Sequence, residues 1–426
     1  MAKNTSHTLK NKFIYQVFTR QHSKSQDFQG IIDDLNRIKS MGVDIIYLLP
    51  FHPIGKKDRK GEIGSPYAIY DYYAIDPLHG TLDDFKRLVT EVHSRGMKLM
   101  IDIVFNHTSR DSILTQIHPE WFYKKSDGTF ANRIGDWSDI TDFNLTAHPE
   151  IWTYLIDVLK YWAQYVDGYR CDVAPLLPLE FWKQARQELD KYRPDLIWLT
   201  ESVEYGFIKY LRDMGYDAST DSQMYETFDI CYDYDIFSFM DGYLSGKNSL
   251  ERYLYELWRQ EVTYPKNYVK LRAFENHDQE RIANKVNNPT KLIQMTALQF
   301  FLKGTPMIYA GQEHQVSVRP SLFENDLVPW NEKLSIENLI RKLSKIKKLD
   351  IMSKGIYDFI NTKNIAHLQY KFGNELLIGI FNLENQTHTS IDLPNGKYLN
   401  VLSNQLYEVK DGMIELSDEP IIIHIQ

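Results

Sequence analysis

The sequence has little cysteine: its 426 residues include two, Cys171 and Cys231. Proteins held together by disulfides use more, and a metal site would need clustered ligands. We therefore expect both cysteines to be buried, reduced thiols, and we find no pattern typical of a transition-metal site.

Long apolar runs are also missing. The longest, residues 45–51 and 97–105, are far too short to span a membrane. Residues 1–12 are polar and lack the apolar core of a signal peptide. These features predict a soluble cytoplasmic protein with no membrane partner.

Runs of basic residues are absent as well. The chain has 49 Lys and Arg against 57 Asp and Glu, a net charge of -8. This mild acidic excess argues against a nucleic-acid partner. With 43% hydrophobic residues the chain has enough apolar surface to fold. Its length predicts a large domain of catalytic size and a smaller one.

The first two thirds of the sequence alternate between apolar runs of strand length and amphipathic helices. About eight such units predict a (β/α)₈ TIM barrel. A doubly wound open sheet is the alternative, but no Gly-rich phosphate loop follows the first strand. The predicted strands are residues 13–18, 43–49, 97–105, 166–172, 196–201, 218–220, 269–275 and 307–309.

Two further segments depart from this alternation. Residues 107–147 lack strong periodicity, which predicts a short subdomain inserted after the third strand. After residue 354 the pattern has period two, with turn signals at Gly373, Gly396 and Gly412 that predict an antiparallel β-sandwich. We therefore predict a catalytic barrel over residues 1–350, including the subdomain, and a C-terminal β-domain over residues 351–426.

Acidic residues stand where the predicted barrel strands end. Asp172 ends the fourth strand, Glu201 the fifth, and Asp278 follows the seventh. Asn106 and His107 end the third. The carboxyl ends of barrel strands converge on one face, where active sites lie. A set of converging acids favours cleavage of glycosidic bonds, in which one carboxylate attacks and another carries the proton for the leaving oxygen.

Arg170 stands two residues before Asp172 on the same predicted strand, so both side chains should share a face. Its fixed positive charge is expected to lower the pKa of Asp172. Crowding by Asp172 and Asp278 is expected to raise the pKa of Glu201 and keep it protonated.

At these residues the sequence resembles the α-amylase family, glycoside hydrolase family 13. The motifs follow the family's order over residues 15–313. The four principal ones end predicted strands: Asp-Ile-Val-Phe-Asn-His at 102–107, Asp-Gly-Tyr-Arg-Cys-Asp at 167–172, Thr-Glu at 200–201 and Phe-Glu-Asn-His-Asp at 274–278. Flanking matches are Tyr67 and residues 71–77, 142–144 and 304–313.

The resemblance implies three catalytic roles. Asp172 is the nucleophile that forms a covalent glycosyl-enzyme, Glu201 is the general acid and then the base, and Asp278 stabilises the transition state. Retention of configuration follows, and the Asp172 and Glu201 carboxyls should lie about 5–5.5 Å apart.

It also implies four substrate-binding residues. Arg170 orients the nucleophile, His107 and His277 donate hydrogen bonds to the sugar, and Tyr67 stacks on its ring. For Tyr67 the alternative is packing within its loop. For Asp102 we favour a structural hydrogen bond at the barrel rim over a functional role.

The sequence departs from the family in places that bear on specificity. Val173-Ala174-Pro175 replaces the Lys-His pair that many α-amylases carry after the nucleophile, which argues against the standard specificity for long starch chains. Gly64 stands where α-glucosidases that act from a chain end often have an acid, which argues against a closed pocket.

No cofactor is expected to be required, although calcium is an open alternative. Asn106 could bind calcium together with Asp136, Asp139 or Asp142, since calcium takes several hard oxygen ligands. The other interpretation, which we favour, is an acidic loop in solvent.

The function predicted is a retaining hydrolase of malto-oligosaccharides or other α-glucans. A 4-α-glucanotransferase, or an enzyme acting on sucrose or trehalose, would use the same residues. A barrel that only binds its ligand is disfavoured because all three acids are present. Substrate length, linkage and oligomeric state stay open.

Overall fold

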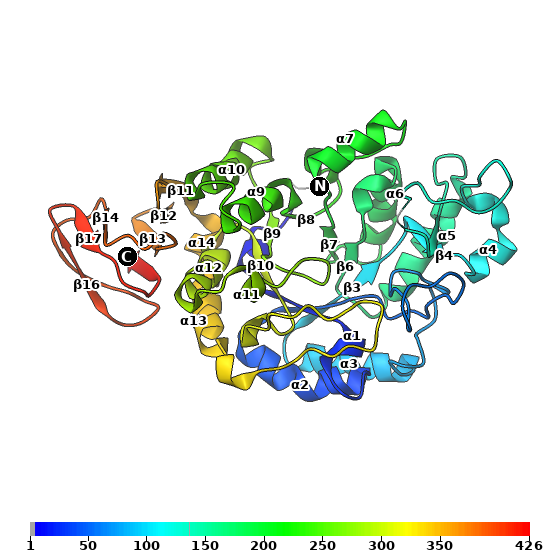
Figure 1. The fold of residues 1–426 in the computed structure, drawn as a ribbon, viewed down its shortest axis with the longest axis horizontal. Coiled ribbons are helices and arrows are strands. Elements are labelled where there is room, and N and C mark those ends of the chain that lie inside the picture. The colour runs from blue at the N-terminus through cyan, green and yellow to red at the C-terminus, as the bar shows by residue number, and fades with distance from the viewer. Residues whose placement is uncertain (1–4, 136) are drawn as a thin grey trace. The chain divides into compact units, whose positions relative to one another are not determined.

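The computed structural model describes residues 5–135 and 137–426. Eight parallel strands form a closed barrel in the order β1-β10-β9-β8-β7-β6-β3-β2 (Figure 1). This confirms the predicted barrel and excludes the open sheet. The strands are β1 Ile14–Val17, β2 Ile45–Leu48, β3 Lys98–Ile103, β6 Gly168–Cys171, β7 Ile197–Thr200, β8 Ile230–Tyr232, β9 Lys270–Arg272 and β10 Thr305–Tyr309.

Contacts within the described chain divide it into two compact units. The first comprises residues 14–232 and 319–329, and the second residues 5–13, 233–318 and 330–426. The first contains β1 to β8, with helices α1 Thr19–His22, α2 Phe28–Ser40, α3 Leu82–Ser94, α4 Ile113–Ile117, α5 Glu150–Trp162, α6 Leu179–Asp190, α7 Tyr205–Asp213 and α8 Asp221–Met224.

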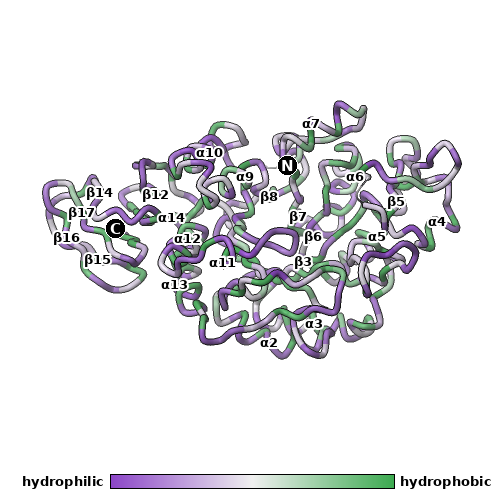
Figure 2. Tube along the Cα trace, in the orientation of Figure 1, coloured by the Kyte–Doolittle hydropathy of each residue, from purple (hydrophilic) through white to green (hydrophobic). Residues whose placement is uncertain are grey.

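The helices of the first unit form where the sequence combines an apolar stripe with a capping residue. The side chain of Asp27 accepts a hydrogen bond at the start of α2, and Thr81 and Asp84 form the predicted capping box of α3. Hydrophobic and hydrophilic residues alternate along both helices (Figure 2). Because the apolar residues recur at helical spacing, one face of each helix is buried.

Close strand packing explains one glycine of the 167–172 motif. Gly168 opens β6 and pairs with Ile197 of β7. A Cβ at this position would lie 2.6 Å from the carbonyl oxygen of Ile197. A larger residue would therefore push apart the two strands that carry Arg170 and lead to Glu201.

The prediction of a sixth strand at residues 218–220 was wrong. Thr220 is the N-cap of α8, where it forms a capping box with Gln223. The sixth barrel strand is β8, which begins at Ile230. Threonine is common both in strands, because it is β-branched, and at helix N-caps, because its hydroxyl accepts a backbone hydrogen bond. At Thr220 the second role applies, so the residue did not indicate a strand.

A short subdomain is inserted after the third barrel strand, as the fold prediction expected. Its two strands, β4 His107–Ser109 and β5 Ile140–Asp142, pair antiparallel. The rings of Phe122 and Phe143 stack with their centroids 4.9 Å apart, and both are buried. The aromatic residues of this loop thus supply the subdomain with a core.

The C-terminal segment forms two four-stranded antiparallel sheets, β11-β12-β13-β18 and β14-β17-β16-β15. Buried side chains from both sheets, including Ile378 and Ile414, belong to one hydrophobic cluster, which confirms the sandwich. The predicted turns at Gly373 and Gly412 have φ of 59° and 71°, which glycine adopts readily. The strands are β11 Ile356–Asn361, β12 Ala366–Phe372, β13 Glu375–Phe381, β14 His388–Ser390, β15 Gly396–Leu399, β16 Leu406–Lys410, β17 Met413–Glu415 and β18 Ile421–Ile425.

The second unit also contains six α-helices among its described residues. They are α9 Tyr234–Leu244, α10 Leu250–Thr263, α11 Ile282–Lys285, α12 Pro289–Phe301, α13 Glu337–Lys347 and α14 Ile351–Lys354. Across residues 5–135 and 137–426, every helix is too short or too polar to cross a bilayer. Cys171 and Cys231 are both buried and form no disulfide, as predicted.

Candidate functional site

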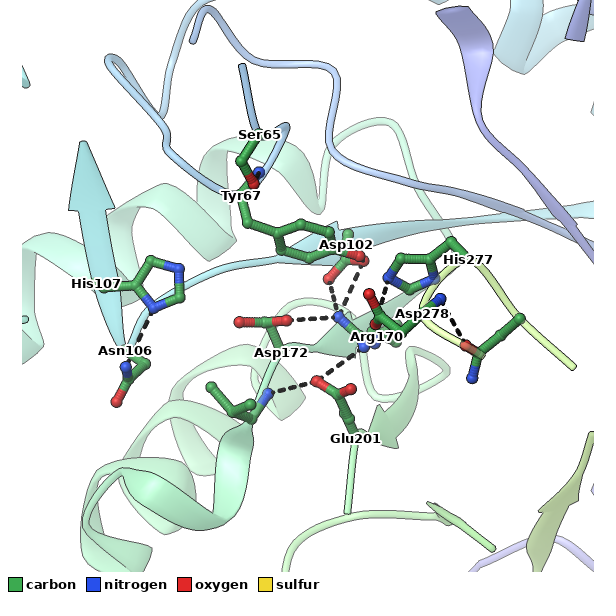
Figure 3. Close-up of polar contacts among 12 residues, drawn as sticks. Ser65, Tyr67, Asp102, Asn106, His107, Arg170, Asp172, Glu201, His277 and Asp278 are labelled. Atoms are coloured by element: carbon green, nitrogen blue, oxygen red, sulfur yellow. Dashed lines mark hydrogen bonds and ion pairs between the residues drawn. The ribbon is translucent and has the colours of Figure 1, made fainter. Parts of the chain in front are cut away.

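The side chain of Arg170 is the centre of the site in the first unit (Figure 3). Its Nη1 donates hydrogen bonds to Oδ1 of Asp102 and Oδ1 of Asp172, each over 2.9 Å. Its Nη2 lies 2.8 Å from Oε2 of Glu201. One guanidinium therefore contacts carboxylates that follow or belong to β3, β6 and β7.

Arg170 keeps its positive charge in this setting. Burial by itself would lower the pKa of the guanidinium, but the carboxylates of Asp102 and Glu201 raise it well above its usual value. The hydrogen bond between Arg170 and Asp172 agrees with the prediction that both side chains lie on one face. The contact with Glu201 was missed because the sequence argument considered only the other acids near it.

Asp102 holds this arrangement together from β3. Its fully buried carboxylate accepts hydrogen bonds from Tyr47 Oη over 2.6 Å and from Tyr67 Oη over 3.0 Å, in addition to that from Arg170. The structural hydrogen-bonding role predicted for Asp102 is confirmed. The bond also fixes the phenol end of Tyr67, whose stacking on a sugar stays a prediction.

The backbone turns sharply after Asp172 and directs an amide at Glu201. Val173 has φ 35° and ψ 38°, a left-handed conformation that a β-branched residue rarely adopts. Its N–H donates to Oε2 of Glu201 over 2.9 Å. The side chains of Asp172 and Glu201 are each 9% exposed, whereas that of Arg170 is 0% exposed. The two carboxylates are therefore partly accessible to solvent, whereas the arginine that contacts them is fully buried.

His107 follows β3 and is held by its neighbour. The Nδ2 of Asn106 lies 3.1 Å from Nδ1 of His107. Burial lowers the pKa of His107 to about 4, although the carboxylates of Asp142 and Asp139 act to raise it. The imidazole is therefore neutral at pH 7 and, with Nδ1 accepting from Asn106, carries its proton on Nε2.

Because His107 is buried, the free energy of unfolding should depend on pH. The His107→Asn variant lacks this titrating group and so shows how much of the dependence comes from His107. The pKa of about 4 lies below the ordinary value of about 6.5, so the unfolded chain binds more protons between these values. The contribution of neutral His107 to the free energy of unfolding is therefore fully present above pH 6.5 and is lost as the pH falls towards 4. For His107 the loss between pH 7.5 and 5 is about 2 kcal/mol.

Urea unfolding of the native protein and the variant at both pH values measures this term. Asparagine does not titrate, so the difference in unfolding free energy between the two proteins should shrink by about 2 kcal/mol at pH 5. A difference that stays constant across the window would contradict the neutral, buried state of His107.

The second unit carries the remaining predicted residues, His277 and Asp278, after β9. Nε2 of the buried His277 lies 2.9 Å from Oδ2 of Asp278, whose side chain is 44% exposed. The backbone N–H of Asp278 donates to Oδ1 of Asn276 over 2.9 Å, and Nδ2 of Asn276 donates to Tyr234 Oη over 2.8 Å. These bonds fix the loop that presents the Asp278 carboxylate to solvent.

The residues considered for calcium are paired with the protein's own cations. Oδ1 of Asn106 accepts a hydrogen bond from Arg133, whose Nε also lies 2.9 Å from Oδ2 of Asp142. Oδ1 of Asp139 lies 3.3 Å from Nζ of Lys60. Asp136 lies outside the described residues. Because Asp139 and Asp142 are both buried, the expectation of an acidic loop in solvent was wrong for these two residues.

These pairings leave the donor set a poor fit to calcium, since a second cation in the same place would be repelled. Among the described residues, no group of three or more His, Cys, Asp or Glu side chains could hold a metal ion. The candidate ligand Asn106 serves instead as an acceptor for Arg133.

Sequence reasoning missed three side chains around the site. Tyr47 lies within β2, where it was counted as apolar. The Arg170 guanidinium lies 5.4 Å from the ring centroid of Tyr232, which escaped notice because the sixth strand was misplaced. Arg133 lies in a loop without periodicity, and one signal could have pointed to it: it is the only basic residue between Asp127 and Asp142, a stretch rich in aspartate.

Comparison with known proteins identifies the family of the chain. Residues 13–137 and 118–351 match the family described as "Alpha amylase, catalytic domain". The chain belongs to the α-amylase family. Residues 359–423 match "Bacterial Alpha amylase C-terminal domain", so the two family matches together run over most of the sequence.

Solved structures of this family resemble the chain along nearly its whole length. An alpha-amylase from Lactobacillus plantarum is 43% identical with a TM-score of 0.96, over 99% of this chain and 100% of that one. A noncanonic maltogenic alpha-amylase, AmyB, from Thermotoga neapolitana is 34% identical with a TM-score of 0.87, over 98% and 99%.

Other α-amylase family relatives are longer. The intracellular maltogenic amylase of Bacillus subtilis (strain 168) is 27% identical over 341 residues, which is 75% of this chain and 54% of that protein. The chain thus spans about half the length of this curated relative.

Proposed function

We propose that the protein is a retaining α-glycosidase that hydrolyses α-glucosidic bonds in malto-oligosaccharides and other α-glucans. The observation that carries the proposal is the contact of one buried guanidinium, that of Arg170, with both Asp172 and Glu201. Family membership and the similarity to two solved amylases support the substrate class.

In the first step the carboxylate of Asp172 attacks the anomeric carbon while Glu201 gives its proton to the leaving oxygen. The hydrogen bond from Arg170 to Oδ1 of Asp172 orients this carboxylate for the attack. In the second step Glu201 removes a proton from water, which displaces Asp172 and restores the α configuration. We expect the two carboxyls to lie about 5 Å apart, as this mechanism requires.

Other residues are assigned to substrate binding by their match to the family motifs. Asp278 stabilises the charge that develops on the sugar in the transition state. His277 and neutral His107 donate hydrogen bonds to sugar hydroxyls, and Tyr67 stacks on the ring. The hydrogen bond from Tyr67 to Asp102 supports this last role because it holds the ring in a fixed orientation.

Domain boundaries and location form part of the same proposal. We assign residues 1–350 to the catalytic barrel, residues 107–147 within it to the inserted subdomain and residues 351–426 to the C-terminal domain. The word "intracellular" in the name of the Bacillus subtilis relative supports a cytoplasmic location.

The stereochemistry of the product tests this mechanism. Proton NMR during cleavage of maltoheptaose should show the α-anomer of the new reducing end first, with the β-anomer rising later by mutarotation. The β-anomer appearing first would mean inversion, and would exclude a covalent intermediate on Asp172.

A further inference from the structure

The inserted subdomain contains an arginine surrounded by oxygen atoms from three separate segments. Nε of Arg133 donates to Oδ2 of Asp142 in β5 over 2.9 Å, and Nη1 donates to the carbonyl of Leu176 after β6 over 3.2 Å. Nη2 donates to Oδ1 of Asn106 after β3. The side chain of Arg133 is 7% exposed and that of Asp142 is 0% exposed.

A carboxylate, an amide oxygen and a backbone carbonyl converging from separate segments would suit a hard divalent cation such as calcium. Here every one of these oxygens accepts a hydrogen bond from the same guanidinium. The guanidinium carbon also lies 5.5 Å from the ring centroid of Tyr123 and 5.6 Å from that of Tyr216, within range of cation–π attraction.

We propose that the Arg133 guanidinium is the resident cation of the inserted subdomain and takes the place that calcium would occupy between Asn106, Asp142 and Leu176. Its planar fork joins the subdomain to the loops that follow β3 and β6. Because Oδ1 of Asn106 accepts from Arg133, the amide nitrogen faces Nδ1 of His107. The arginine thus links the stability of the subdomain to the orientation of a proposed sugar-binding residue, and the subdomain stays folded without calcium.

Thermal unfolding tests this proposal independently of the enzymatic activity. The Tm of the native protein should be the same in excess EDTA and in excess calcium chloride. Arg133→Met keeps an unbranched apolar side chain but removes the guanidinium, the charged partner of the buried Asp142, so the Tm of this variant should fall by about 3–5 °C.

Arg110→Met is the matched control, since Arg110 lies in the same subdomain, donates to the carbonyl of Ser138 and is 20% exposed. Its Tm should fall by less than that of the Arg133 variant. A native Tm that drops in EDTA and recovers with calcium would overturn the proposal. So would an Arg133 variant that loses no more than the control. The first comparison uses native protein alone, so it decides the matter even if the variant does not fold.

Discussion

Glu201→Gln should lower kcat/KM on maltoheptaose by about 10³-fold or more, because the glutamine amide is too weak an acid to protonate the leaving oxygen. The change is nearly isosteric, and the new amide oxygen can still accept the N–H of Val173. Arg170 keeps Asp102 and Asp172 as partners. The loss should therefore lie in the chemistry and not in the fold, which circular dichroism and Tm can check.

The leaving group provides a sharper test of the role of Glu201. A maltosyl fluoride releases fluoride, which needs little help from an acid, so the variant should form the covalent intermediate from it at a rate much closer to native. Glu204→Gln is the matched control, because Glu204 is an exposed acid three residues further along the chain. Near-normal turnover of maltoheptaose by the Glu201 variant would contradict the acid assignment.

Asp172→Asn should have an effect at least as large, about 10⁴-fold or more on every substrate, because it removes the nucleophile. Unlike the loss in the Glu201 variant, this loss should not be relieved by a fluoride leaving group. Native protein treated with a fluorosugar trap should gain one sugar mass on the peptide that contains Asp172, as measured by mass spectrometry. The variant should gain none.

The control here is Asp213→Asn, at an exposed acid at the end of α7. It should retain native activity and still be labelled on Asp172. A sugar adduct on a different residue of the native protein would contradict the nucleophile assignment.

Most of the barrel was predictable from the sequence because its strands are buried on both faces and thus appear as continuous apolar runs. The exception was the sixth strand. β8 is three residues long and ends in Tyr232, and the stretch before it holds Thr220, a β-branched residue that caps a helix. A short strand beside a capping residue gives no clear period, so pattern alone could not place it.

The site was predictable where its residues adjoin strand ends and less so where they lie in loops. The side-chain alternation of a strand placed Arg170 beside Asp172, and the hydrogen bond between them agrees. The bond of Glu201 to the amide of Val173 depends on a left-handed backbone at a valine, which sequence preferences argue against. Arg133 is bound by residues distant in the chain, so no local spacing could reveal its contacts.

The measurement that tests the central claim most directly is product analysis with pure maltoheptaose, counting new reducing ends, with Glu201→Gln as the inactive control. We predict shorter oligosaccharides and a rise in reducing ends for the native protein only, with product sizes that distinguish internal from terminal cleavage. Longer and shorter products at a constant number of reducing ends would contradict hydrolysis and indicate a glucanotransferase. No change in the substrate would contradict an α-glucan substrate of this kind, and would direct the search to sucrose, trehalose and branched glucans.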